Sequence, residues 1–353
     1  MDFGLHFLFS CASSQSPTQR YRDSLEQAIR AEALGFESVW PVEHHFHPEI
    51  SVMPCPTLFL AAVAARTQRL RLGTGIVQLP LQHPLRVAEE FATLDVLSGG
   101  RAELGVGRGG NAAHYAGFGL SLDDSRERFA EGASLLQRLF TDERCSFRGR
   151  FYQVEDAALA PRPLHVPRPR VAVTSDETAR FAGERGLPVM IATHVNPLPR
   201  VRALLEVYET AREDGGHARA TPHDLTLLMP MYVAETEATA RADASPNVDH
   251  YRHLLTELAR AALGKCETPA QRAALAPILQ RLGSLGFEQI NDGMGCLGTP
   301  AQCRELLMKL EREFNPGRVI AWFNFGGLLP HPSVLRCMEL FAREVMPSFA
   351  AAS

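Results

Sequence analysis

Residues 94–109 read LDVLSGGRAELGVGRG, and this stretch contains the junctions that decide the fold. It begins at the end of a segment with apolar residues at helical spacing, and Gly99 and Gly100 can adopt the left-handed conformation that stops a helix. Residues 102–107 then form a short apolar strand, which a glycine-rich loop joins to a further helix near residues 126–140. This order of elements is typical of a parallel α/β sheet.

The same alternation of strands and helices extends over most of the 353 residues. Eight strands with helical crossovers predict one domain over residues 1–353, folded as a closed parallel (β/α)8 TIM barrel. An open doubly wound sheet is the alternative, because strand number alone does not prove closure. Residues 236–297, between the seventh and eighth strands, are too long for a simple crossover, so we expect a helical insertion or lid there. The strands are expected at residues 3–9, 36–41, 70–79, 102–107, 170–174, 188–192, 225–233 and 318–323.

Composition excludes several classes of protein. The net charge is −4 and no block of Lys and Arg occurs, which argues against a nucleic-acid partner. No apolar run approaches the roughly 18 residues of a membrane helix, and the chain starts without a secretory signal pattern. The seven cysteines are odd in number and never spaced as C-x-x-C, which fits reduced thiols better than disulfides or zinc. We therefore expect a cytoplasmic globular protein without a membrane contact.

Polar residues follow several of the expected strands. In a parallel barrel the residues just past the strand ends face one mouth, which would bring His44, His45, Arg108 and Ser175 together. Imidazole is the side chain best suited to acid/base chemistry near neutral pH, so His44 and His45 are candidates for that role. One of them would face the mouth and the other the barrel wall.

Two other interpretations of the histidine segment remain open. Buried imidazoles can be purely structural, satisfied by backbone partners. Glu43, His44, His45 and His47 could also bind a metal. However, neighbouring residues on an extended segment point apart and the H-E-x-x-H spacing is missing, so no metal site is predicted.

Further candidate residues could bind a phosphate. Arg108 can bind one bidentately within the flexible backbone that ends at Gly109, and Ser175 and Thr178 lie at the start of a helix, where free N–H groups attract anions. The alternatives are a solvated arginine and ordinary helix capping. Gly75 lies inside an expected strand, where glycine often marks a close backbone approach to a ligand.

These segments, in this order, resemble the bacterial luciferase-like flavin monooxygenase family. The most specific are VEHHF at residues 42–46 and SGGRAELGVGRG at residues 98–109. The resemblance spans nearly the whole chain and also includes FG at 3–4, LGTGI at 72–76, QHPLRVAEE at 82–90, TSDET at 174–178, GTP at 298–300, WFNFGGLLPH at 322–331 and EVMP at 344–347.

The resemblance implies an enzyme that receives reduced FMN (FMNH2) from a separate flavin reductase and reacts it with O2. The C4a-peroxyflavin formed would oxygenate a small organic substrate, such as an aldehyde, a ketone or a natural-product intermediate. A homodimer is implied as well. True luciferases carry a reactive cysteine where this chain has Gly107, so light emission is not implied.

The resemblance also assigns residues. It makes His44 the catalytic histidine and places a non-proline cis peptide bond between Gly75 and Ile76, beneath the flavin ring. The phosphate ligands of FMN would be Arg108, Ser175 and Thr178, beside Gly109.

The substrate pocket and the rival functions are less specified. His45, Phe46 and Phe7 are expected to line an apolar pocket, although core packing explains aromatic residues equally well. The rivals are an F420-dependent oxidoreductase that transfers hydride, a non-catalytic flavin-binding subunit, and a metal-dependent hydrolase.

Overall fold

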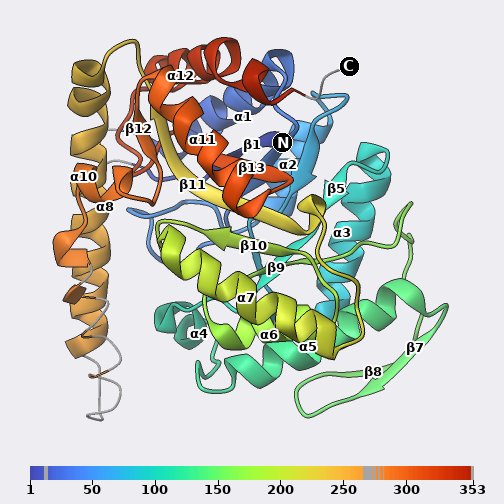
Figure 1. Ribbon diagram of the computed structural model, residues 1–353. Coiled ribbons are helices and arrows are strands. Elements are labelled where there is room, and N and C mark those ends of the chain that lie inside the picture. Colours follow the sequence, from blue (N-terminus) through green and yellow to red (C-terminus); the bar gives the residue numbers. More distant parts are fainter. Residues whose placement is uncertain (12–14, 265–272, 274–275, 277–278, 281, 351–353) are drawn as a thin grey trace.

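The computed structural model describes residues 1–11, 15–264, 273, 276, 279–280 and 282–350. Eight runs of parallel strand form its sheet, which lies at the centre of the molecule (Figure 1). The third and fourth runs are each interrupted, so β3 pairs with β5 while β4 pairs with β6. The third and fourth runs therefore pair with each other at both ends of the strand order, once through β4 and β6 and once through β3 and β5. The barrel closes in this way, as predicted. The runs are β1 (Asp2–Phe7), β2 (Ser38–Pro41), β3 (Arg71–Gly73) with β4 (Val77–Gln78), β5 (Ala102–Glu103) with β6 (Gly105–Gly107), β9 (Arg170–Ala172), β10 (Val189–Ala192), β11 (Leu225–Val233) and β13 (Arg318–Trp322).

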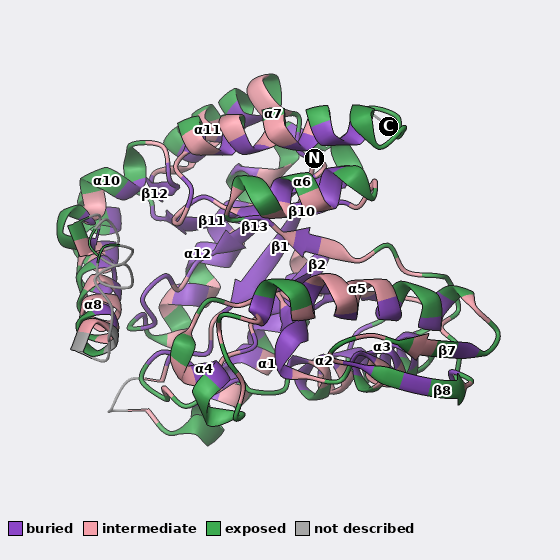
Figure 2. Cartoon of the chain, turned by 90° about the horizontal axis from the view of Figure 1, so that it is seen from below, coloured by how far each residue is buried: buried purple, intermediate pink, exposed green. Residues whose placement is uncertain are grey.

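Helices surround the barrel and turn their buried faces toward it (Figure 2). The predicted starts and stops are found at the first helix, where the Ser16 side chain accepts the N–H of Gln19 and Gly35 ends the helix at φ 88°. The capping box expected at Gln19 does not form, because its amide donates to Asp23 instead. The helices are α1 (Pro17–Leu34), α2 (Pro56–Ala64), α3 (Pro84–Ser98), α4 (Ala112–Gly117), α5 (Ser125–Thr141), α6 (Asp176–Glu184), α7 (Leu198–Asp214), α11 (Pro300–Phe314) and α12 (His331–Glu344).

Strand alternation sorts the side chains of β1 between the two faces of the barrel. The ring of Phe3 packs against Phe341 of α12, outside the barrel, while the ring of His6 packs against Trp322 inside it. At the N-terminal end of the barrel, Arg318 bonds to Glu103 at 2.7 Å. This end holds buried ion pairs beside a groove of about 530 Å³, whereas the candidate site residues follow the strands at the opposite end.

Two parts of the fold were not expected from the sequence. Between α5 and β9 the chain forms an antiparallel hairpin of β7 (Cys145–Arg148) and β8 (Gln153–Ala157). A short strand, β12 (Cys296–Gly298), pairs with the second half of β11. Both are brief, and their alternation is too short to stand out in the sequence.

The region between β11 and β13 contains the expected helical insertion. It includes α8 (Glu237–Gly264) and α10 (Phe287–Asn291), and α8 stands beside the barrel as a long helix (Figure 1). Part of the range 236–297 lies outside the described residues, so the lid role stays a prediction. Within the described part of the chain, every helix is too short or too polar to cross a membrane.

Candidate active site

A loop that follows β2 carries the glutamate and the histidines predicted from the sequence. Glu43 is 3% exposed, and its carboxylate accepts hydrogen bonds from the Gln78 backbone N–H at 3.1 Å, the Gln82 amide at 3.1 Å and His45 Nε2 at 3.0 Å. The His44 backbone N–H donates to the Met53 carbonyl at 2.9 Å. The loop is therefore fixed at both its acidic and its imidazole residues.

A further histidine, His114 of α4, completes this cluster and was not found from the sequence. Its Nδ1 lies 3.1 Å from Gln78 Oε1, and its Nε2 accepts the His45 backbone N–H at 3.3 Å. Because Nε2 accepts, Nδ1 carries the proton and donates to Gln78. The Gln78 amide nitrogen in turn donates to the Glu43 carbonyl at 2.9 Å, so all four residues form one network.

Four imidazoles meet in this cluster. The ring of His114 lies 4.4 Å from that of His44, 5.4 Å from that of His45 and 6.3 Å from that of His47, centroid to centroid. Burial, followed by repulsion from His114, lowers the pKa of His44 to about 3, and burial with the neighbouring histidines lowers that of His114 to about 4. His44 is thus neutral at physiological pH, and its Nδ1 is buried without a hydrogen-bond partner among the described residues.

Metal binding gains no geometric support from this cluster. Among the described residues, no three His, Cys, Asp or Glu side chains are arranged to hold a metal ion. Each of His45 and His114 already uses ring nitrogens in the network.

The candidate phosphate ligands lie at the ends of two neighbouring strands. Arg108 follows β6, and its Nη1 donates to the Ser125 hydroxyl at 2.9 Å. Ser175 and Thr178 follow β9, which pairs with β6, and they form a capping box at the start of α6. An ion pair of 3.1 Å between Arg126 and Glu177 joins the first turns of α5 and α6. The structure therefore brings the two predicted halves of an anion site to adjacent strand ends.

Between the histidine cluster and the anion residues, the barrel wall is formed by the segment that joins β3 to β4, because β2 pairs with β3 and β4 pairs with β6. The Gly75–Ile76 peptide bond is cis, as the resemblance implied. A Cβ on Gly107 would lie 2.5 Å from Ile76 and 3.3 Å from Ala172. A Cβ on Gly109, which has φ 68°, would lie 2.2 Å from Gln78 Oε1. The side chains of Ile76 and Gln78 thus occupy the space that side chains at residues 107 and 109 would need.

The expected pocket residues lie in different surroundings, and their roles stay predictions. Phe46 is 56% exposed and packs against Phe118, and a Cβ on Gly117 would lie 2.2 Å from the Phe46 ring. Phe7 is buried against Phe9 and Phe59, on the strand face opposite His6. His45 is held by Glu43, as described above.

Aromatic residues from distant segments line another part of the mouth. Trp322 of β13 packs against His6 at 5.1 Å, against Phe325 at 4.6 Å and against Tyr251 of α8 at 5.5 Å. Burial, followed by repulsion from His194, lowers the pKa of His6 to about 3. The insertion thus contributes a side chain to the mouth, which its local sequence does not reveal.

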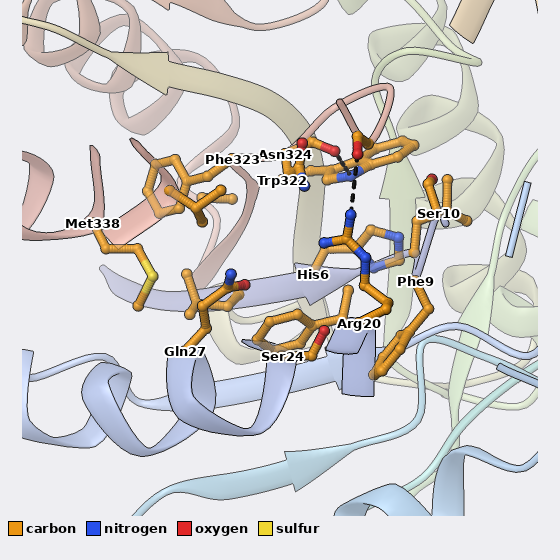
Figure 3. A pocket seen from close by; sticks show the side chains of 16 residues that line it. His6, Phe9, Ser10, Arg20, Ser24, Gln27, Trp322, Phe323, Asn324 and Met338 are labelled. Carbon is orange, nitrogen blue, oxygen red and sulfur yellow. Dashed lines mark hydrogen bonds between the residues drawn. The ribbon is translucent and has the colours of Figure 1, made fainter. Parts of the chain in front are cut away.

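Behind this aromatic group lies a small cavity of about 30 Å³ between β1 and α1. Arg20 reaches into it beside His6 and donates to the Gly327 carbonyl at 3.0 Å (Figure 3). A volume of this size accommodates water rather than a cofactor.

The chain is similar to known proteins over most of its length. A model described as luciferase-like monooxygenase matches residues 1–314. The chain belongs to the luciferase-like monooxygenase family. It is 30% identical to limonene 1,2-monooxygenase of Rhodococcus erythropolis, over 92% of this chain and 80% of that enzyme. The crystal structure of monooxygenase RslO1 from Streptomyces bottropensis superposes with a TM-score of 0.82 at 30% identity, covering 99% of this chain and 100% of that one.

Relatives within the family differ in cofactor. The oxygenase component of flavin-dependent trigonelline monooxygenase from Acinetobacter baylyi is 28% identical over 66% of this chain and 65% of that protein. An F420-dependent glucose-6-phosphate dehydrogenase from Amycolatopsis mediterranei is 36% identical over 47% of this chain and 51% of that enzyme. The predicted family and the predicted enzyme class, a flavin-dependent monooxygenase, are confirmed.

Proposed function

We propose that this protein is the oxygenase of a two-component monooxygenase, which takes reduced FMN from a separate reductase and uses O2 to oxygenate a small apolar substrate. One observation carries the proposal. His44, which is neutral at physiological pH, and the residues suited to a phosphate follow barrel strands at one mouth, and the cis Gly75–Ile76 peptide lies on the strand run between them.

The residues present fit FMN. Arg108 and the first turn of α6, which begins after Ser175, would bind the phosphate, because a guanidinium and free helix N–H groups both favour an anion. The cis Gly75–Ile76 peptide, on the strand run between the strands that lead to His44 and to Arg108, would contact the ring. When bound, reduced FMN supplies two electrons to O2, so that one oxygen atom enters the substrate and the other leaves as water.

His44 would accept a proton during this reaction. Its backbone is fixed by the Met53 carbonyl, and its ring is neutral at physiological pH. A neutral imidazole beside the bound ring can take a proton from the cofactor or from the substrate adduct. The aromatic residues Trp322, Phe325 and Tyr251 would exclude water from the reacting atoms and favour an apolar substrate.

Two partners belong to the proposal. A separate reductase is supported by the name of the trigonelline relative, which is an oxygenase component. A homodimer is supported by an apolar face on α2 and α3, where Leu58 is 72% and Leu97 is 66% exposed beside a groove of about 620 Å³. Light scattering at micromolar concentration would measure the mass that tests this dimer.

The experiment that tests the function is an anaerobic titration with reduced FMN, followed by rapid mixing with O2. Saturable binding and the absorption of a C4a-oxygenated flavin would support the proposal. F420 is titrated in parallel, because F420-dependent enzymes occur among the relatives. Tight F420 binding without an oxygenated flavin would favour hydride transfer, and binding of neither would refute a flavin-type enzyme.

A further inference from the structure

His114 is the centre of the histidine cluster, although it lies about seventy residues away from the loop that carries the other three. Its ring contacts those of His44, His45 and His47, and also that of Phe46 at 6.3 Å. The side chain is 2% exposed. The contact with His44 is the shortest of the four, with the two ring planes at 87°.

The position of the His114 ring is determined at both nitrogens. Nδ1 donates to Gln78 Oε1, and Nε2 accepts the His45 backbone N–H. The Gln78 Oε1 lies beside Gly109, in the space that a side chain at residue 109 would take. The Gln78 amide nitrogen donates to the Glu43 carbonyl. The ring therefore has one tautomer and one orientation.

We propose that His114 is a positioning residue, which holds the His44 ring in place and keeps it unprotonated. The catalytic consequence rests on the function proposed above, because it takes His44 as the base. The effect on His44 itself does not depend on any cofactor.

Burial is the largest cause of the low pKa of His44, and charge repulsion from His114 adds to it as the pH falls and His114 itself binds a proton. Two imidazoles 4.4 Å apart in a buried site cannot both carry a proton, so they titrate as a coupled pair. The other titratable groups that face His44 are His45 and His47, from its own loop. The nearby carboxylates are directed elsewhere, with Glu43 bonded to His45 and Glu49 to His47. His114, from α4, is thus the principal neighbour that opposes a proton on His44.

Protonation of His44 can be measured directly by NMR titration of the histidine ring signals in the cofactor-free protein, with His44→Gln used for assignment. Two variants remove the titrating neighbour. His114→Gln keeps an acceptor for the His45 N–H, and His114→Phe keeps a ring against His44. In both we expect His44 to bind its proton at a pH higher by about one unit or more. His165→Gln, which removes an exposed histidine at the other end of the barrel, should leave that titration unchanged.

The outcomes separate the inference from the proposed function. Folded His114→Gln and His114→Phe proteins whose His44 titrates as in the wild type would overturn the positioning role, even if both are less stable. If His44 titrates higher in both, the positioning role holds whether or not FMN binds. With FMN bound and turnover measurable, the acidic limb of the pH–rate profile should move upward by the same amount, while a purely structural role would lower turnover equally at all pH values.

Discussion

Trp40 fills the middle of the barrel directly beneath the wall on which we place the cofactor ring. Gly73 makes room for it, because a Cβ at that position would lie 2.3 to 2.5 Å from three atoms of the indole ring. Gly75, at the cis peptide bond, is also close, since its Cβ would lie 3.1 Å from that of Trp40. Gly73→Ala should therefore push the indole toward Gly75 and disturb both the core and the candidate flavin wall.

The magnitude follows from two opposing effects. Overpacking a well-filled core costs about 1–3 kcal/mol of unfolding free energy. Replacing glycine by alanine recovers about 0.4–1 kcal/mol by restricting the unfolded chain. We therefore expect Gly73→Ala to be destabilised by about 1–2 kcal/mol, and its affinity for reduced FMN to fall.

Urea unfolding monitored by circular dichroism measures the first effect, and anaerobic FMN titration measures the second. Gly110→Ala is the matched control, because a Cβ there meets no described atom within 4 Å. Trp40→Phe in the Gly73→Ala background should recover part of the lost stability, since the smaller ring leaves space for the methyl group. If Gly73→Ala unfolds at the same urea concentration as the control and binds FMN as the wild type does, Trp40 does not support the wall.

Three further predictions concern the site and the opposite end of the barrel. His44→Gln should bind reduced FMN as the wild type does while turnover falls by roughly 10²- to 10⁴-fold, and unchanged turnover would remove His44 as the base. Arg108→Ala should weaken reduced FMN binding at least tenfold. Arg126→Ala, which removes only an exposed ion pair, should bind reduced FMN as the wild type does. Equal affinities for the wild type and both variants would contradict the phosphate role of Arg108. Burial alone would raise the pKa of Glu103, but the guanidiniums of Arg318 and Arg71 lower it to about 2. Its stabilising effect is therefore complete above about pH 4.5 and is lost as the pH falls toward 2, so the difference in urea midpoint between wild type and Glu103→Gln should shrink from pH 6 to pH 3.

The sequence predicted those parts of the fold that depend on local signals. The cap at Ser16 and the stops at Gly35 and Gly99 are found where the residue types require them. The strand expected at residues 70–79 is instead two strands, because the chain leaves the ladder at residues 74–76 to form the cis peptide wall. Periodicity cannot reveal such a break, since residues 72–77 (LGTGIV) contain no proline or charged residue that would mark it.

The site was predictable to the extent that it follows strand ends. His44, Arg108 and Ser175 were named because each follows a strand, and barrel topology brings strand ends together. His114 and Tyr251 follow no strand. They lie on α4 and α8, where a buried histidine or tyrosine looks like any other helical residue. Only the tertiary structure shows that they reach the same mouth.

The short helix α4 links the two halves of the site. His114 holds the His44 ring, and the next residue, Tyr115, donates its hydroxyl hydrogen bond to the Arg108 carbonyl. Because these two side chains leave one helical turn in different directions, a displacement of α4 would move the base and the candidate phosphate ligand together. Binding of the cofactor phosphate at Arg108 would then stabilise α4 and, through His114, the orientation of His44. The short helix α4 would in this way couple cofactor binding to the orientation of the His44 ring.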